Sequence, residues 1–189
     1  MAKATKITVQ GGVTSQEVSR IRVDPSGHVV VETGLQSSGQ GHETAFAQLI
    51  AERLGLELGQ IRVVQGDSVS AETGGPTAGS SSLQVGGLTM LRAAEAMLRD
   101  ASARAGEHLE ADAADIVYEN GQFVVAGTDR AVGLFALAGH LQAHGEGGCA
   151  GEAALEGLSA EDAQHLLAER QLRLAPADMA QLHAATEGN

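Results

Sequence analysis

Polar and apolar residues alternate over residues 20–24, and a mostly apolar run follows at residues 28–33. Alternation with a period of two is typical of a strand with one buried face. The sequence Asp-Pro-Ser-Gly at residues 24–27 lies between the two runs. These are turn residues, because proline presets φ and glycine takes the left-handed conformation. The pattern therefore predicts a β-hairpin over residues 20–33.

Apolar residues with helical spacing follow the hairpin. Four of them recur at positions i, i+3, i+4 and i+8: Phe46, Leu49, Ile50 and Leu54. This stripe predicts a helix over residues 44–54, with Gly55 as the glycine that terminates it. Residues 60–65 are rich in valine and isoleucine and are predicted to form a third strand.

A longer helix is predicted at residues 83–107, directly after a run of small residues. One face of this helix carries only leucine and alanine: Leu91, Ala94, Leu98, Ala101 and Ala105. A serine just before the helix would cap its first turn. Further along, Asn-Gly at residues 120–121 separates short strands predicted at residues 115–119 and 122–126. This dipeptide is a strong signal for a tight hairpin.

The character of the sequence changes after about residue 140. Residues 131–142 are apolar and are predicted to be helical. Beyond them the chain is rich in alanine and glutamate, with helices predicted at residues 160–172 and 176–185. Residues 131–189 carry two basic and eight acidic side chains. We therefore expect this last part to be a separate and weakly packed segment.

The elements together predict an α+β fold, in which β-hairpins and a short mixed sheet pack on two long helices and a helical tail follows. Three parts are expected: a loose lead-in at residues 1–17, a subdomain at residues 18–139 and an acidic tail at residues 140–189. The chain has 189 residues, of which 43% are hydrophobic but only 2% aromatic, so the core is expected to be aliphatic.

Charge and cysteine content exclude several classes of protein. The formal net charge is −12, so the chain lacks the basic surface that a nucleic-acid partner requires. Cys149 is the single cysteine, which excludes an internal disulfide and fits a reducing, cytoplasmic compartment. No run approaches the 18 or so apolar residues of a membrane span, and the first residues do not resemble a secretory signal.

Two glycine-rich stretches precede the two long helices. The first is Gly39-Gln40-Gly41, and the second, at residues 73–82, contains only small, uncharged residues. Glycine lets a ligand approach the backbone, and the first N–H groups of a helix have no intrahelical partner. The stretches are therefore a candidate cradle for an anionic ligand, with Gln40 adding a side-chain amide. The alternatives are a tight turn at the first stretch and a flexible linker at the second.

Other kinds of site are weaker. His140 and His144 are one helical turn apart and Cys149 is near them, but a zinc site would need a fourth ligand. We interpret the histidines as scattered surface residues. His42 is next to the glycine loop and could reach a ligand there, but we expect it at the surface as well. The serine-hydrolase pattern Gly-x-Ser-x-Gly lacks its second glycine here, and the phosphate-binding pattern Gly-x-x-x-x-Gly-Lys-Ser is absent.

Several motifs occur in an order that resembles one enzyme family. They are Thr33-Gly34, Gly39-Gln40-Gly41-His42-Glu43-Thr44, Ala47-Gln48, Val63-Val64-Gln65-Gly66-Asp67 and Pro76-Thr77-Ala78-Gly79-Ser80. In this order they resemble the large subunit of the molybdenum hydroxylases, the family of xanthine dehydrogenase, aldehyde oxidase and aerobic carbon monoxide dehydrogenase. The likeness extends from about residue 18 to about residue 137.

The resemblance implies that the chain is one cofactor-binding part of such a large subunit. The implied cofactor is a molybdenum–pterin, which in bacterial members is usually a cytosine dinucleotide. The implied enzyme is an oxidoreductase that hydroxylates its substrate at carbon and passes electrons to iron–sulfur and flavin partners. The residues implied to contact the cofactor are Gly39, Gln40, Gly41, Thr77, Ala78, Gly79, Ser80, Ser82 and Gln84.

The sequence also departs from the family pattern. Ser81 stands where many members have an arginine, and the upstream cofactor segment and the downstream general-base glutamate have no counterpart here. Ala150-Gly151-Glu152 is only faintly similar to the loop with that glutamate, so no catalytic or metal-binding residue is assigned. We expect a fragment that is inactive alone. The alternative is a non-catalytic homologue that binds a partner through its acidic tail.

Overall fold

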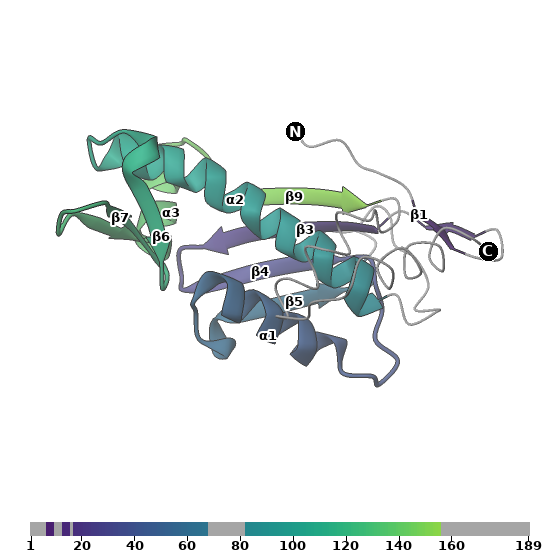
Figure 1. Cartoon of the computed structure of the whole chain (residues 1–189). Coiled ribbons are helices and arrows are strands. Elements are labelled where there is room, and N and C mark those ends of the chain that lie inside the picture. The colour runs from purple at the N-terminus through teal and green to yellow at the C-terminus, as the bar shows by residue number, and fades with distance from the viewer. Residues whose placement is uncertain (1–6, 10–12, 16, 68–81, 156–189) are drawn as a thin grey trace, which may run out of the picture.

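A four-stranded sheet forms the centre of the protein (Figure 1). Its strands are β3 (Glu17–Asp24), β4 (His28–Thr33), β5 (Ile61–Gln65) and β9 (Ala150–Leu155). The computed structural model describes residues 7–9, 13–15, 17–67 and 82–155. The strand order is β5-β4-β3-β9, with β4 and β5 parallel and the other neighbours antiparallel. The predicted mixed sheet is therefore confirmed.

The predicted hairpin is formed by β3 and β4, and its turn has the expected chemistry. The Asp24 side chain accepts a hydrogen bond from the Ser26 N–H at 2.9 Å, and the Asp24 carbonyl accepts one from the Gly27 N–H at 3.1 Å. Gly27 has a φ of +102°, which glycine adopts without strain. The hairpin begins earlier than predicted, because β3 starts at Glu17.

Helix α1 (His42–Leu54) connects the parallel strands β4 and β5 and packs on one face of the sheet. Phe46, Ile50 and Leu54 of the predicted stripe are fully buried. Gly55 ends the helix in the left-handed conformation, with a φ of +61°, and its N–H bonds back to the last turn. A short 3-10 turn (Leu58–Gln60) then leads into β5. The predicted helix and the predicted third strand are both formed, and they make a strand–helix–strand unit with β4.

Helix α2 (Gly87–His108) crosses the same face of the sheet as α1 (Figure 1). Every residue of its predicted apolar face is buried: Leu91, Ala94, Leu98, Ala101 and Ala105. The small side chains bring the helix very near β9. A Cβ added at Gly151 would lie 2.2 Å from the Ala93 carbonyl oxygen, so backbone meets backbone there.

A three-stranded sheet of β6 (Ile116–Glu119), β7 (Gln122–Val125) and β8 (Ala131–Gly133) lies beyond the end of α1 (Figure 1). The predicted tight turn joins β6 to β7, with φ values of +47° at Asn120 and +80° at Gly121. Tyr118 Oη donates to the Leu54 carbonyl at 2.9 Å and so ties this sheet to α1. Burial raises the pKa of Tyr118 to about 12, which keeps the phenol a donor.

Helix α3 (Leu134–Ala143) begins later than predicted. Residues 131–133 were expected to be helical, but they pair with β7 as strand β8. Pairing with a neighbouring strand outweighs the local helical preference of this apolar run. Within the described ranges, no helix combines the length and the apolar character that crossing a membrane would require.

Strand β9 was not predicted, and it corrects the expected change at residue 140. Residues 150–155 pair with residues 17–22 of β3, and Cys149 and Ala153 are buried. The Val23 N–H also donates to the Cys149 carbonyl at 2.9 Å. The expectation of weak packing is therefore wrong for residues 149–154. The helices predicted at residues 160–172 and 176–185 lie outside the described residues.

The expected irregular lead-in contains a short ladder, in which β1 (Ile7–Val9) pairs with β2 (Val13–Ser15). The overall class is α+β, as predicted, with α1 and α2 on one face of the central sheet and a small second sheet beside it (Figure 1).

Candidate functional site

The loop of residues 34–41 lies where the parallel strands β4 and β5 end, at the edge where α/β units bind ligands. Gly39 and Gly41 have φ values of +98° and +78°, so both occupy the left-handed region that favours glycine. A Cβ at either glycine would meet no atom within 4 Å. The predicted turn is therefore formed, and its backbone is open on the outside.

Gln40 is at the exposed tip of this loop. Its side-chain carbonyl accepts a hydrogen bond from the Ser38 N–H and another from the Ser37 hydroxyl. The carbonyl half of the amide thus holds the loop together. The NH2 half is the part of Gln40 that can donate to a ligand.

Helix α1 begins directly after the loop, with Gly41 as its N-cap. Glycine has no side chain, so no side-chain cap bonds to the N–H groups of the first turn. His42 is buried, with only 6% of its surface exposed, and its ring lies 5.1 Å from the ring of Phe46. Its Nδ1 atom is buried without a hydrogen-bond partner. The expectation that His42 is a surface residue is therefore wrong.

The second glycine-rich stretch is described only from Ser82 onward. Thr77, Ala78, Gly79 and Ser80 lie outside the described residues. Ser82–Gly86 forms a single π-helical turn ahead of α2, a conformation that is rare and often found at functional sites. The Ser82 hydroxyl is buried without a hydrogen-bond partner, so Ser82 does not cap α2 as predicted for a serine here. Gln84 is exposed.

The loop and the π turn meet at the same end of the sheet. A Cβ at Gly86 would lie 2.3 Å from Leu35 Cδ1 and 3.6 Å from the Phe46 ring. Any other residue at position 86 would place its Cβ too close to the Leu35 side chain, so glycine is required for this contact. The structure thus brings Leu35, near the start of the 34–41 loop, against Gly86, at the end of the Ser82–Gly86 turn. Of the second stretch in the cradle hypothesis, residues 73–81 lie outside the described residues, so the cradle stays a prediction.

Buried polar residues on β3 and β4 support this end of the sheet, and sequence reasoning assigned them no role. Glu17, Ser19 and Thr33 are almost fully buried. Thr33 Oγ1 donates to Glu17 Oε1 at 2.6 Å, and Ser19 pairs with Thr33 across the ladder. The signal was present, because Glu17 and Ser19 alternate in phase with Ile21 and so belong to the buried face.

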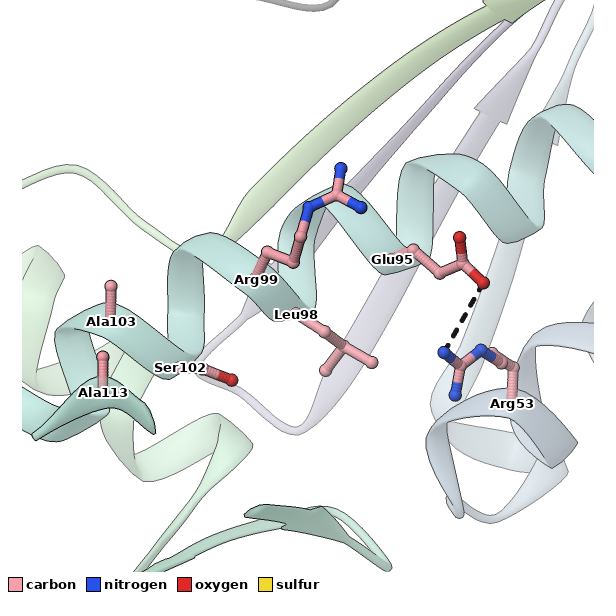
Figure 2. A pocket seen from close by; sticks show the side chains of 7 residues that line it. All are labelled: Arg53, Glu95, Leu98, Arg99, Ser102, Ala103 and Ala113. Atoms are coloured by element: carbon pink, nitrogen blue, oxygen red, sulfur yellow. Dashed lines mark ion pairs between the residues drawn. The ribbon is translucent and has the colours of Figure 1, made fainter. Parts of the chain in front are cut away.

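A groove of about 480 Å³ lies away from this site, along the second half of α2 (Figure 2). It is lined by Arg53, Glu95, Leu98, Arg99, Ser102, Ala103 and Ala113. Figure 2 shows Arg53 reaching from α1 toward Glu95, and the two form an ion pair at 3.6 Å. This pairing offsets one of the two cationic groups, so the groove is a weaker candidate for an anion than the two loops.

The partial zinc set considered from the sequence does not form a metal centre. Across the described ranges, no group of three His, Cys, Asp or Glu side chains is arranged to hold a metal ion. The rings of His140 and His144 stack at 4.2 Å, and Cys149 is buried. Burial raises the pKa of the Cys149 thiol to about 11, so it is not the thiolate that a metal would bind.

Glu152 forms an ion pair on a different face of the sheet from Glu17. Its carboxylate pairs with Arg20 at 2.7 Å on the exposed face of the sheet, whereas Glu17 belongs to the opposite face, which the helices cover.

Comparison with known proteins identifies the family. The model of the molybdopterin cofactor-binding domain family matches residues 1–169, and the chain belongs to this family. The match continues past residue 140, so the expectation that the likeness ends at about residue 137 is wrong. The residues that converge here fit such a group, because two orphaned buried polar atoms and an uncapped helix start suit a ligand rich in hydrogen-bonding groups.

Two curated relatives are each similar to more than half of this chain. The carbon monoxide dehydrogenase large chain of Afipia carboxidovorans is 34% identical over 116 residues, which are 61% of this chain and 14% of the relative. Subunit gamma of the 6-hydroxypseudooxynicotine dehydrogenase complex of Paenarthrobacter nicotinovorans is 35% identical over 129 residues, 68% of this chain and 16% of the relative. The chain therefore spans only about 14–16% of the length of these proteins.

Solved structures agree with this assignment. A Cu,Mo carbon monoxide dehydrogenase matches with a TM-score of 0.66 and 30% identity, over 76% of this chain and 18% of the matched chain. Quinoline 2-oxidoreductase from Pseudomonas putida 86 matches with a TM-score of 0.63 and 31% identity, over 76% of this chain and 19% of the matched chain. The predicted fold and the predicted family are both confirmed.

Proposed function

We propose that this chain forms one wall of the molybdenum–pterin site in the large subunit of a molybdenum hydroxylase. The observation that carries the proposal is the meeting of the 34–41 loop with the Ser82–Gly86 turn. The buried Nδ1 of His42, directly after the loop, and the buried Oγ of Ser82, which begins the turn, are both without a partner. Buried polar atoms are nearly always satisfied, so an orphan in each of the two segments supports a ligand there.

Specific roles follow for the residues of the two segments. Gly39 and Gly41 let the cofactor approach the backbone, Gln40 donates from its amide, and the first N–H groups of α1 face the anionic part. Ser82 and Gln84 contact the dinucleotide. In the same proposal Thr77, Ala78, Gly79 and Ser80 pass close to the pterin or the metal, as the family resemblance implies.

The bound cofactor would supply the redox chemistry of a hydroxylation at carbon, and this chain would hold and orient it. We infer the cytosine dinucleotide form from the family resemblance, and two neutral loops that offer N–H groups and hydroxyls suit its anionic groups. The relatives are named as a large chain and as a subunit of a complex. We extend this to a complex with the other large-subunit segments and with iron–sulfur and flavin subunits. A cytoplasmic location fits the single reduced cysteine.

The test is cofactor content in a pair of matched variants. The chain is produced together with cofactor maturation proteins, and molybdenum and released pterin are measured per folded protein. Gln40→Ala is expected to lower the pterin content by about tenfold, the loss of one or two ligand hydrogen bonds. Gln142→Ala removes an equally exposed amide from α3 and should change nothing.

Two results would overturn the proposal. One is a parent chain that contains neither molybdenum nor pterin, which would show that this chain does not bind the cofactor unaided. The other is an equal pterin content in Gln40→Ala, Gln142→Ala and the parent, which would remove the loop from the site.

A further inference from the structure

Glu17 is a carboxylate buried in the sheet beneath the two helices. Only 3% of its surface is exposed, and it lies on the same face of β3 as Ser19, Ile21 and Val23. A buried carboxylate is costly unless hydrogen bonds stabilise it, and an apolar residue would serve the core better. Its presence beside the cofactor loops therefore calls for a role other than packing.

The Glu17 carboxylate fixes the direction of one hydroxyl group. Thr33 Oγ1 donates a hydrogen bond to Glu17 Oε1 at 2.6 Å, and a hydroxyl has a single proton to donate. The single hydroxyl proton of Thr33 therefore points at Glu17, and the Oγ1 lone pairs are left to accept. One of them accepts the Leu35 N–H at 3.3 Å. The carboxylate thus orients Thr33, and Thr33 holds the backbone of the loop.

Leu35 transmits this restraint to the second segment. Leu35 is 5% exposed, and its Cδ1 lies so near Gly86 that a Cβ added at Gly86 would be only 2.3 Å from it. Thr33 is held from its other side as well, because its carbonyl accepts the Gly66 N–H at 3.2 Å. The position of Leu35 therefore determines how the 34–41 loop rests on the Ser82–Gly86 turn.

We propose that Glu17 is a positioning residue, which sets the start of the 34–41 loop through Thr33 and joins that loop to the Ser82–Gly86 turn. The inference deepens the proposed function, since it names a residue that shapes the cofactor site without touching the cofactor. Its direct consequence is protection of one backbone amide, that of Leu35, and this consequence exists without any bound cofactor.

The test measures hydrogen exchange of individual amides by NMR in the cofactor-free chain. Glu17→Leu removes the acceptor and keeps the volume. We expect the Leu35 amide to exchange about tenfold faster, or more, because Thr33 Oγ1, its acceptor, loses the hydrogen bond that orients it. Glu17→Gln keeps a neutral acceptor and should give a smaller increase. Glu152→Leu removes a carboxylate from the opposite face of the sheet and should leave the Leu35 amide unchanged.

Variants of Thr33 separate positioning from general stability. Thr33→Val keeps the shape but removes the hydroxyl, so it should raise the Leu35 exchange rate as Glu17→Leu does, and Thr33→Ser should restore protection. These variants and Glu17→Gln carry the test should Glu17→Leu not fold. Unchanged Leu35 exchange in the folded variants overturns the proposal, as does an equal increase at all amides.

Pterin content is a separate readout. Glu17→Leu should contain less pterin per folded protein than Glu152→Leu after production with maturation proteins. If the parent contains no pterin, the proposed function fails while the exchange result still decides the role of Glu17. If pterin binds equally to both variants, the positioning role of Glu17 for the cofactor is refuted.

Discussion

Polar groups are satisfied differently at the two ends of the central sheet. The turn end comprises residues 24–27, Gly55 and residues 120–121, and the loop end comprises residues 33–42 and 82–86. At the turn end, local chemistry supplies partners: Asp24 bonds to its own turn, and Tyr118 bonds to the end of α1. At the loop end, His42 and Ser82 each bury a polar atom without a partner.

The unpartnered buried atoms indicate that a ligand binds at the loop end. Two further unpartnered buried atoms, Ser19 Oγ and Gln65 Oε1, lie in the strands toward the loop end. Arg53 has a buried Nε without a partner near the turn end, but its guanidinium already pairs with Glu95. A fold completes its own hydrogen bonds where only stability is required. The loop end departs from that rule, because buried polar atoms there have no partner.

The largest effect is expected in the core that both ends share. Gly151→Ala would place a Cβ 2.2 Å from the Ala93 carbonyl oxygen and 2.6 Å from the Met97 nitrogen. These are backbone atoms, so helix α2 must move, and we expect a loss of about 3 kcal/mol in the free energy of unfolding. Urea denaturation measures it. Gly148→Ala is the control, because a Cβ there meets no atom within 4 Å, and its free energy of unfolding should stay within about 0.5 kcal/mol of the parent. Equal losses in the two variants would contradict the close packing of β9 against α2.

A smaller effect depends on pH. Burial raises the pKa of Cys149 from 9.0 to about 11, with Asp100 adding to the shift and Arg104 opposing it. A raised pKa in the folded state means stability that is complete below about pH 9 and is lost as the pH rises through about 11. The advantage of the parent over Cys149→Ala should therefore shrink by roughly 2 kcal/mol across this window. A constant difference in denaturation free energy would contradict a buried thiol.

At the turn end, a glycine substitution should cost stability alone. Gly121 has a φ of +80°, and a left-handed conformation costs an L-residue about 1–2 kcal/mol. Gly121→Ala should therefore lower the free energy of unfolding by that amount and leave pterin content per folded protein unchanged. Gly133→Ala, at a φ of −71° and with no atom near its Cβ, is the neutral control. A lower pterin content in Gly121→Ala would contradict the view that only the loop end of the sheet contributes to cofactor binding.

At the loop end, a substitution should separate stability from binding. Ser82→Ala removes a buried hydroxyl that has no partner, so the cofactor-free chain should become more stable by about 1 kcal/mol while pterin content falls. Thr89→Val is the matched control, because the Thr89 hydroxyl donates to the Val85 carbonyl at 2.6 Å. Its loss should cost about 1 kcal/mol. Thermal unfolding compares the two, and destabilisation by both would mean that Ser82 has a partner within the fold.

Elements that depend on neighbouring residues were predictable from the sequence. The hairpin of β3 and β4, helix α1 with its terminal Gly55, and the Asn120-Gly121 turn all form as their patterns indicate. Each rests on side-chain spacing or on a glycine in the left-handed region. Gly39 and Gly41 belong to the same class, since a glycine pair before a helix defines its own turn.

Elements that depend on distant partners were missed. Residues 150–155 are mostly alanine and glycine, and they become a strand because β3 offers an edge and α2 needs small neighbours. His42 was expected at the surface, although it lies four residues before Phe46 and so continues the buried stripe of α1. The partnership of Glu17 with Thr33 joins residues that are 16 positions apart, which no local pattern encodes.

The sequence alone determined the local turns, the helix faces, the net negative charge and, through an ordered set of motifs, the family. Spacing and backbone preference act between near neighbours, so these features are legible in the chain itself. Only the tertiary structure decided that β9 completes the sheet, that the 34–41 loop rests on the Ser82–Gly86 turn, and that a buried carboxylate orients the start of that loop. Those features require close packing of distant segments, and packing is decided by the whole fold.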